Sequence, residues 1–201
     1  MQQYQQLIKI IGNELKGMGF VKKGKDFYIL KENNWGVINI QPGKWNSQKE
    51  KSFTLNLGIC SNLIRKTIEE IGADVVPDID RCHWKMRIGF LMPEKKDHWW
   101  EISESTSIDQ LGQEITTILE TNAIPEIEKN ISDTGLMDQM LNGNSQGITE
   151  LQRYIYLTTF LKLFDDGRLA LMITELEKIA KGKSWELAAK EHIKELANYG
   201  K

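Results

Sequence analysis

The residues best able to do chemistry lie on one side of two predicted strands in the middle of the chain. Residues 53–59 alternate strictly between large apolar and small or polar side chains, and residues 83–90 repeat the pattern with cations on the polar side. A predicted hairpin over residues 27–40 adds a phenol and amides to that side. Such a surface suits an anionic or polar ligand, or an acidic segment of a partner protein. The candidate ligand-binding residues are Tyr28, Asn39, Gln41, Asn56, His83, Lys85 and Arg87.

The pairing of the two strands follows from their apolar faces. If the strands are antiparallel neighbours, aligning those faces also brings the polar residues opposite one another. The pairs that this alignment predicts are Asn56 with Arg87, Gly58 with Lys85 and Cys60 with His83. The alternative for this surface is an ordinary solvated sheet face, or a face whose polar groups are satisfied by the C-terminal helices.

Cysteine and histidine residues invite other chemistry, but their spacing predicts neither a metal site nor a catalytic one. Zinc sites need closely spaced ligand pairs, and the chain has no Cys-x-x-Cys or His-x-x-x-His. In the proposed strands Cys60 and Cys82 point to opposite faces, which also argues against a disulfide. A nucleophilic Cys60–His83 pair oriented by Asp97 is geometrically allowed, but no helix N-terminus or glycine elbow would activate the thiol. We therefore predict no catalytic residue, no metal and no cofactor.

The overall composition narrows the class of protein. At 201 residues the chain can bury the core of one large domain, or of one domain with an appendage. Its 26 basic and 28 acidic residues give a net charge of −2, which argues against a nucleic-acid-binding protein with a basic surface. No apolar run predicts a membrane span or a secretion signal. Two cysteines fit a reducing compartment, so we expect a cytoplasmic protein.

The N-terminal part of the chain predicts one helix and one hairpin. Apolar residues recur at helical spacing over residues 2–18. Asn33-Asn34 suits a two-residue turn in which both residues take positive φ. This turn sets Phe27 opposite Ile40, and a one-residue slip would separate the large apolar side chains of the hairpin.

Helices are predicted from residue 107 to the C-terminus, because the apolar period there changes from two to about 3.6. Ser107 and Gln110 form a plausible capping box, and Pro125 divides the first two of these helices. Residues 142–147 are the strongest linker signal in the chain. The other predicted elements are a helix over 61–71 that starts at Ser61 or Asn62, a strand over 99–102, and helices over 151–164, 169–180 and 184–197.

An ordered series of short motifs resembles a known family. The series consists of residues 15–24 (Leu-Lys-Gly-Met-Gly-Phe-Val-Lys-Lys-Gly), Phe27, residues 37–41, residues 53–58, Cys82, Arg87-Ile88-Gly89 and Asp97-His98-Trp99-Trp100. This order is similar to that of the bacterial domain-of-unknown-function family 4304, over roughly residues 1–140. The resemblance implies an α+β fold, and it carries no reaction, ligand or catalytic residue.

These observations predict an α+β protein, with an N-terminal helix on a mainly antiparallel sheet of about five strands, followed by helices. Residues 1–142 form the α+β domain, and residues 148–201 form a helical extension packed on it. The predicted function is a non-catalytic cytoplasmic binding or interaction module that uses the polar face of the sheet. The alternative is a small hydrolase or transferase whose anionic substrate is held there by Arg87 and Lys85. A protein partner or a small anionic ligand is expected, and neither nucleic acid nor membrane.

Overall fold

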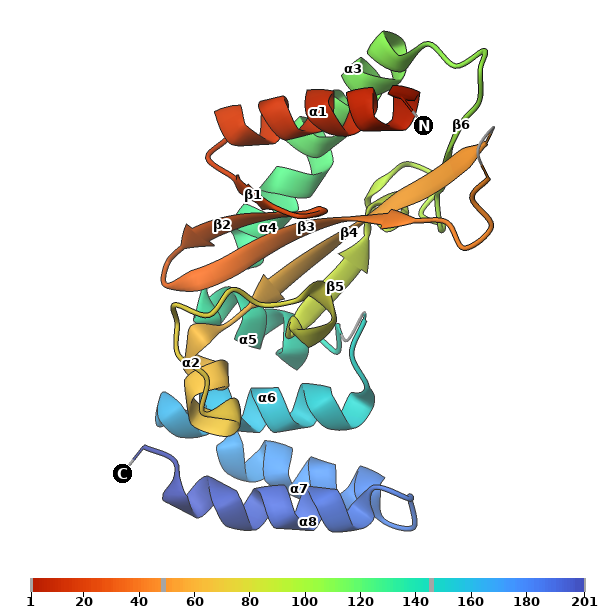
Figure 1. The fold of residues 1–201 in the computed structure, drawn as a ribbon. Coiled ribbons are helices and arrows are strands. Elements are labelled where there is room, and N and C mark those ends of the chain that lie inside the picture. The colour runs from red at the N-terminus through yellow and green to blue at the C-terminus, as the bar shows by residue number, and fades with distance from the viewer. Residues whose placement is uncertain (1, 48–49, 145–146, 201) are drawn as a thin grey trace.

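An antiparallel sheet with one long helix precedes a series of helices, which confirms the α+β fold class (Figure 1). The computed structural model describes residues 2–47, 50–144 and 147–200. The strands are β1 (Val21–Lys23), β2 (Asp26–Lys31), β3 (Asn34–Pro42), β4 (Lys51–Cys60), β5 (Trp84–Arg87) and β6 (Trp100–Ile102). The α-helices are α1 (Gln2–Gly17), α2 (Asn62–Ile64), α3 (Ile108–Ile118), α4 (Ile124–Asn130), α5 (Asp133–Leu141), α6 (Glu150–Leu163), α7 (Leu169–Ala180) and α8 (Glu186–Glu195). Shorter helical turns cover Arg65–Glu69, Ile79–Arg81, Ile88–Leu91, Leu119–Ala123 and Leu196–Asn198.

The strand order is β1-β2-β3-β4-β5, with β6 paired to the first residues of β4. The predicted register of β4 and β5 is confirmed, since Asn56 lies opposite Arg87 and Gly58 lies opposite Lys85. The ladder begins one residue later than predicted: Trp84 is its first β5 residue, so it contains no Cys60–His83 pair. The strand also ends early, because the chain turns into a short 3₁₀ segment after Arg87.

The predicted register of the first hairpin is wrong by two residues. Phe27 lies opposite Ile38, not Ile40, because the residues of positive φ in the turn are Glu32 and Asn33. An even shift leaves every side chain on its predicted face, so the polar and apolar faces are as expected. The short strand β1, which pairs with β2 at the outer edge of the sheet, was not predicted.

Asn34 explains why the turn lies one residue earlier. Its side chain is fully buried, and its Nδ2 donates to the Ile131 carbonyl at 2.8 Å and to Asp133 at 2.9 Å. Its Oδ1 accepts from the Asn62 backbone N–H at 2.9 Å. Asn34 therefore joins the hairpin to α2 and to the start of α5, and these distant partners determine where β3 begins.

The apolar face of the sheet carries the main core. Helix α1 packs Leu7, Ile11 and Leu15 onto it, and α1 and α3 lie side by side over the sheet (Figure 1). Gly36 admits helix α4, because a Cβ at Gly36 would lie 2.9 Å from a methyl carbon of Ile127. The opposite, polar face therefore remains for other contacts.

The helical region differs from its prediction in one cap and in one boundary. The side chain of Ser107 makes no capping hydrogen bond, so the expected capping box is absent. Pro125 lies in the first turn of α4, and a π-helical turn joins that helix to α3 without a break. The chain breaks instead before Ser132, whose hydroxyl caps α5 by accepting from the Gly135 N–H. The predicted cap at Ser61 is confirmed, since its hydroxyl accepts from the Ile64 N–H.

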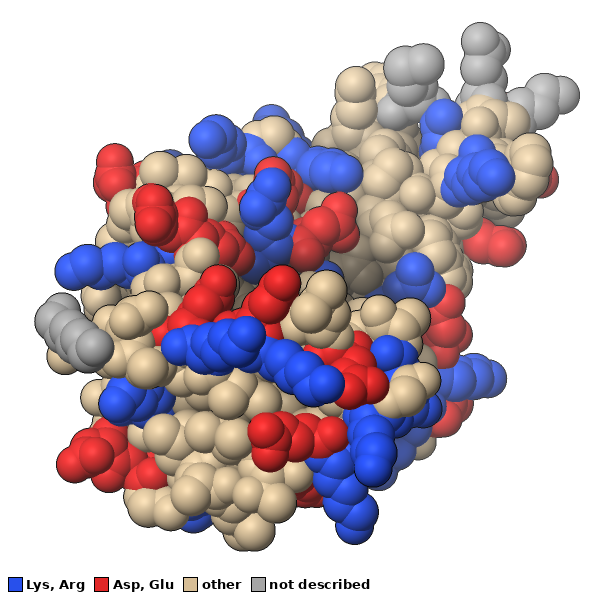
Figure 2. Space-filling model, turned by 90° about the horizontal axis from the view of Figure 1, so that it is seen from below, with Lys and Arg blue, Asp and Glu red and all other residues tan. Residues whose placement is uncertain are grey.

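Of the C-terminal helices, the first belongs to the main core and the last two pack around a separate cluster. Helix α6 contributes Leu157, Phe160 and Leu161 to the main core, whereas α7 and α8 pack around a second, smaller cluster. Seen from below, charged side chains of both signs interleave on the molecule (Figure 2). The domain boundary at residue 142 stays a prediction, and residues 145–146 of the predicted linker lie outside the described residues.

Candidate functional site

The polar face of the sheet is divided into a covered half and an open half. The covered half lies beneath residues 72–82, whose Val76, Ile79 and Cys82 pack on it. Gly58 permits this close approach, because a Cβ there would lie 2.7 Å from Cys82 Sγ. The open half forms a cavity of about 450 Å³, which is within the usual size range of small-molecule sites. Its lining consists of Gln41, Asn56, Ile79, Asp80, Lys85, Met86, Arg87, Phe90, Asp97 and Gly147.

A chain of side-chain amides orients one wall of this cavity. Asn39 Nδ2 donates to the Asp26 carboxylate, and Asn56 Nδ2 donates both to Asn39 Oδ1 at 3.0 Å and to Gln41 Oε1 at 2.9 Å. Since a carboxylate only accepts, Asp26 determines which way each amide along the chain is turned. The Nε2 group of Gln41 is left at the cavity end of the chain, without a partner among the described residues. The wall therefore presents the Gln41 amide donor to the cavity.

The two cations of the site hold different partners. Arg87 Nη1 lies 2.5 Å from an Asp97 carboxylate oxygen, and its guanidinium stacks 5.4 Å from the centre of the Trp99 ring. Lys85 Nζ donates to the Asp80 backbone carbonyl at 2.9 Å and pairs with no carboxylate in the described parts of the chain. The charge of Lys85 is thus uncompensated, and the guanidinium of Arg87 has N–H groups left to donate to a ligand.

Two glycines bring distant segments to the rim of the cavity. A Cβ at Gly89 would lie 2.2 Å from the Lys96 carbonyl oxygen, so only glycine lets the 93–98 segment pass and place Asp97 beside Arg87. Gly147 has a φ of +77° and would bring a Cβ to 2.5 Å from Lys85 Cβ. The lining residues that were not predicted from the sequence are Ile79, Asp80, Met86, Phe90, Asp97 and Gly147, although the two glycines and the polar loops were visible signals.

Four of the seven predicted site residues line the cavity: Gln41, Asn56, Lys85 and Arg87. Asn39 is buried one step along the amide chain. Tyr28 lies in the covered half, where its hydroxyl donates to Asp26 at 3.2 Å. Burial raises the pKa of the phenol, and the negative charge of Asp26 raises it further. His83 lies outside the lining, at the end of the sheet against α6.

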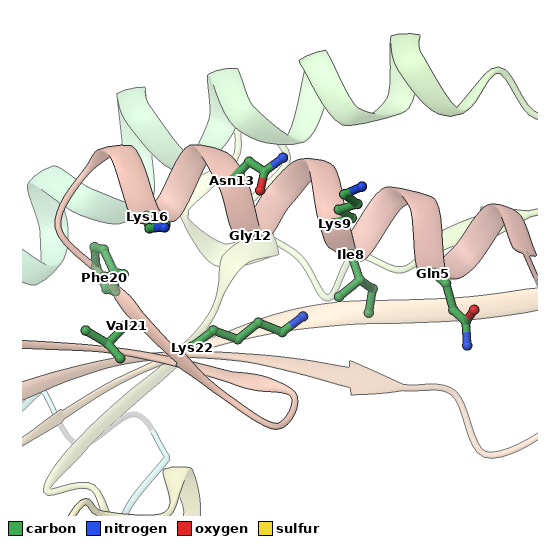
Figure 3. A pocket seen from close by; sticks show the side chains of 9 residues that line it. All are labelled: Gln5, Ile8, Lys9, Gly12, Asn13, Lys16, Phe20, Val21 and Lys22. Atoms are coloured by element: carbon green, nitrogen blue, oxygen red, sulfur yellow. The ribbon is translucent and has the colours of Figure 1, made fainter.

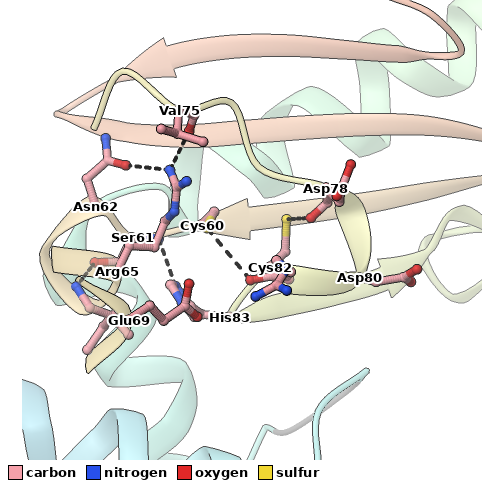
Figure 4. A network of polar contacts seen from close by, with 12 residues as sticks. Cys60, Ser61, Asn62, Arg65, Glu69, Val75, Asp78, Asp80, Cys82 and His83 are labelled. Atoms are coloured by element: carbon pink, nitrogen blue, oxygen red, sulfur yellow. Dashed lines mark hydrogen bonds and ion pairs between the residues drawn. The ribbon is translucent and has the colours of Figure 1, made fainter. Parts of the chain in front are cut away.

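His83 is buried with Cys60 and Cys82, and the half-buried Glu69 lies beside it (Figure 4). The Ser61 backbone N–H donates to His83 Nδ1 at 2.9 Å, so the neutral ring carries its proton on Nε2, which lies 3.9 Å from Glu69 Oε1. The ring of Tyr156 on α6 closes the other side, with ring centroids 4.7 Å apart. Asp97, the acid considered as a partner for His83, pairs with Arg87 instead.

The two cysteines are free, and both are buried in one cluster on the polar face. Their predicted opposite orientation is wrong because Cys82 precedes β5, in the turn that folds over Gly58. Neighbouring Cys82, and then His83, lower the pKa of the Cys60 thiol to about 6 against the opposing effect of burial, and burial raises the pKa of Cys82. Arg65 closes this half, since its Nη1 donates to the Val75 carbonyl at 2.6 Å and to Asn62 Oδ1 at 3.1 Å.

Among the described residues, no three histidine, cysteine or acidic side chains are grouped so that they could hold a metal ion. None of the helices in the described ranges combines the length and the apolar character that crossing a membrane requires.

Comparison with known proteins gives one match. Neither the curated proteins nor the solved structures include a match to this chain. The family model described as "Domain of unknown function (DUF4304)" matches residues 11–129. The matched region contains all the strands and most of the cavity lining, whereas Gly147 and helices α5 to α8 follow it. With more than half of its residues matched, the chain belongs to the DUF4304 family.

Proposed function

We propose that this protein is a non-catalytic binding module that holds a small polar molecule in the cavity of the open half. The observation that carries the proposal is the convergence of three hydrogen-bond donors in this cavity: the Gln41 amide, the Lys85 ammonium and the free part of the Arg87 guanidinium. These donors suit a carboxylate or phosphate group.

The ligand class follows from the acidic side of the cavity. The Asp97 carboxylate is engaged by Arg87 and Trp99, but the Asp80 carboxylate has no partner among the described residues. An anion with a cationic or hydrogen-bond-donating group at its other end would satisfy both sides, with Ile79 and Phe90 as apolar contacts. A zwitterion of amino-acid size has this character.

The same geometry favours a binding module over the alternative of a hydrolase or transferase. Among the residues that the structure describes, the cavity lining contains no cysteine, histidine, serine or threonine, and its Asp97 carboxylate is paired with Arg87. The cysteine–histidine cluster is buried beneath residues 72–82 and against α6. Two free, buried thiols also support a reducing compartment, as expected for a cytoplasmic protein.

A thermal-shift screen tests this function. The panel contains free amino acids, their N-acetylated forms, their amides, phosphomonoesters and simple amines. We expect free amino acids to raise the melting temperature, and both acetylation and amidation to reduce the shift, because each removes one of the two charges. Arg87→Gln and Lys85→Gln should abolish the shift with little change in the melting temperature of the unliganded protein. A shift that persists in both variants, or no shift with any member, contradicts the proposal.

A further inference from the structure

A second surface, unrelated to the cavity of the open half, lies along helix α1. Two adjoining hollows of about 360 and 500 Å³ share Gln5, Ile8 and Lys22. They therefore form one groove between α1 on one side and β1 with the start of the β3–β4 connection on the other, as Figure 3 shows for the first hollow. We refer to it as the α1 groove.

The rim of the α1 groove is cationic throughout. Lys9 and Lys16 lie on the helix, Lys22 lies on β1, and Lys51 borders the second hollow. None of these four lysines forms an ion pair with any described residue, and neither lining contains an aspartate or glutamate. This contrasts with the mixed charge of the face in Figure 2. A chain of net charge −2 has thus concentrated unpaired positive charge at one groove.

The groove also offers an apolar floor and amide groups. Ile8 and Gly12 of α1 provide apolar surface between the lysines. Asn13 and Asn46 add side-chain amides, which can hydrogen-bond to a peptide backbone.

The spacing of the charges selects the kind of ligand. Lys9 and Lys16 are seven residues apart on one helix, about 10 Å along its axis, and an extended chain covers this distance in about three residues. A fatty acid has a single charge and would leave most of the lysines unpaired. A single-stranded nucleic acid would need exposed aromatic rings for its bases, but in the lining Phe20 is buried and the half-buried Tyr4 ring packs against Phe53.

The open edge of the sheet adds a way to hold an extended chain. β1 pairs only with β2 in the described sheet, and the two-residue turn after Lys23 makes Lys23 and Asp26 a hydrogen-bonded pair. The backbone N–H and C=O of Lys22, the middle residue of β1, then face away from β2. We propose that the α1 groove binds an extended acidic peptide of a partner protein, in which carboxylates alternate with apolar side chains.

Fluorescence anisotropy with labelled short peptides tests the proposal. The probes are a peptide alternating glutamate with leucine, its lysine–leucine counterpart, and an oligothymidylate of similar length. The test variant is Lys9→Gln/Lys16→Gln/Lys22→Gln. The matched control is Lys178→Gln/Lys181→Gln/Lys183→Gln, which removes three exposed lysines from the end of α7 and the connection to α8. Thermal melts verify that both triple variants remain folded.

We expect the glutamate–leucine peptide to bind the unmodified protein and the control variant equally tightly. Its affinity for the test variant should be at least tenfold weaker. Raised salt should weaken the binding. Three results would overturn the proposal: no binding of the acidic peptide, an equal loss in both triple variants, or tighter binding of the oligothymidylate, which would make the groove a nucleic-acid site. Because the cavity of the open half is intact in both variants, the amino-acid thermal shift should be unchanged in each.

Discussion

The covered and open halves of the polar sheet face share strands, yet they have different chemistry. In the covered half, Val37 and Gly58 are small enough for residues 72–82 to lie against the sheet. In the open half, Gln41 and Asn56 lie further along the same two strands, and they line the cavity. The difference teaches that the size and polarity of a few strand residues decide whether a sheet face becomes core or site.

Filling the space at Gly58 should have the largest effect. Gly58→Val places methyl groups where Cys82 Sγ and Ile79 already lie within 2.7 Å of the added Cβ, so residues 72–82 must move away from the sheet. We expect the free energy of unfolding to fall by about 2 to 3 kcal/mol in urea titrations. Asn56→Val, two residues along the same strand in the open half, should cost about 1 kcal/mol or less. Equal costs would mean that the two halves do not differ in packing.

Removing the Arg65 guanidinium, which hydrogen-bonds to the segment that covers the sheet, should have the second-largest effect on the free energy of unfolding. Arg65→Met loses the hydrogen bonds that this buried side chain donates to Val75 and Asn62, and we expect a loss of about 2 kcal/mol in the free energy of unfolding. Amide hydrogen exchange should increase most over residues 72–82. Arg81→Met, at an exposed side chain on the same connection, is the control and should stay within about 0.5 kcal/mol. Unchanged exchange in Arg65→Met would show that other contacts hold the cover.

Removing the group that orients the side-chain amides should affect ligand binding more than stability. Asp26→Asn replaces an acceptor-only group with one that can also donate, so Asn39, Asn56 and Gln41 are no longer forced into one orientation. We expect a loss of about 1 kcal/mol in stability and roughly tenfold weaker binding of the best amino acid from the screen. Asp78→Asn, an exposed acid on the covering connection, should change neither. Unaltered affinity in Asp26→Asn would show that Asp26 does not orient the Gln41 amide for the ligand.

The sequence alone identified both faces of the sheet and the β4–β5 register, because strict alternation leaves only one alignment of the apolar sides. It misplaced the first hairpin because Asn34 is held by residues near position 131, and no local pattern shows such a partner. Four cavity residues were found because they lie on strands. Asp80, Asp97 and Gly147 were missed because they reach the cavity through irregular segments, whose paths depend on close approaches at Gly58 and Gly89.

The central claim is that the open half presents the Gln41 side-chain amide to a ligand. The most direct test is a ¹H–¹⁵N correlation spectrum that follows the side-chain NH₂ signals while the best amino acid from the screen is added. We predict that the Gln41 NH₂ pair shifts and saturates with the ligand, that Arg87→Gln removes the response, and that Asn13 in the α1 groove does not respond. Saturating shifts confined to Asn13 or other residues away from the cavity, with Gln41 unmoved, would contradict the account.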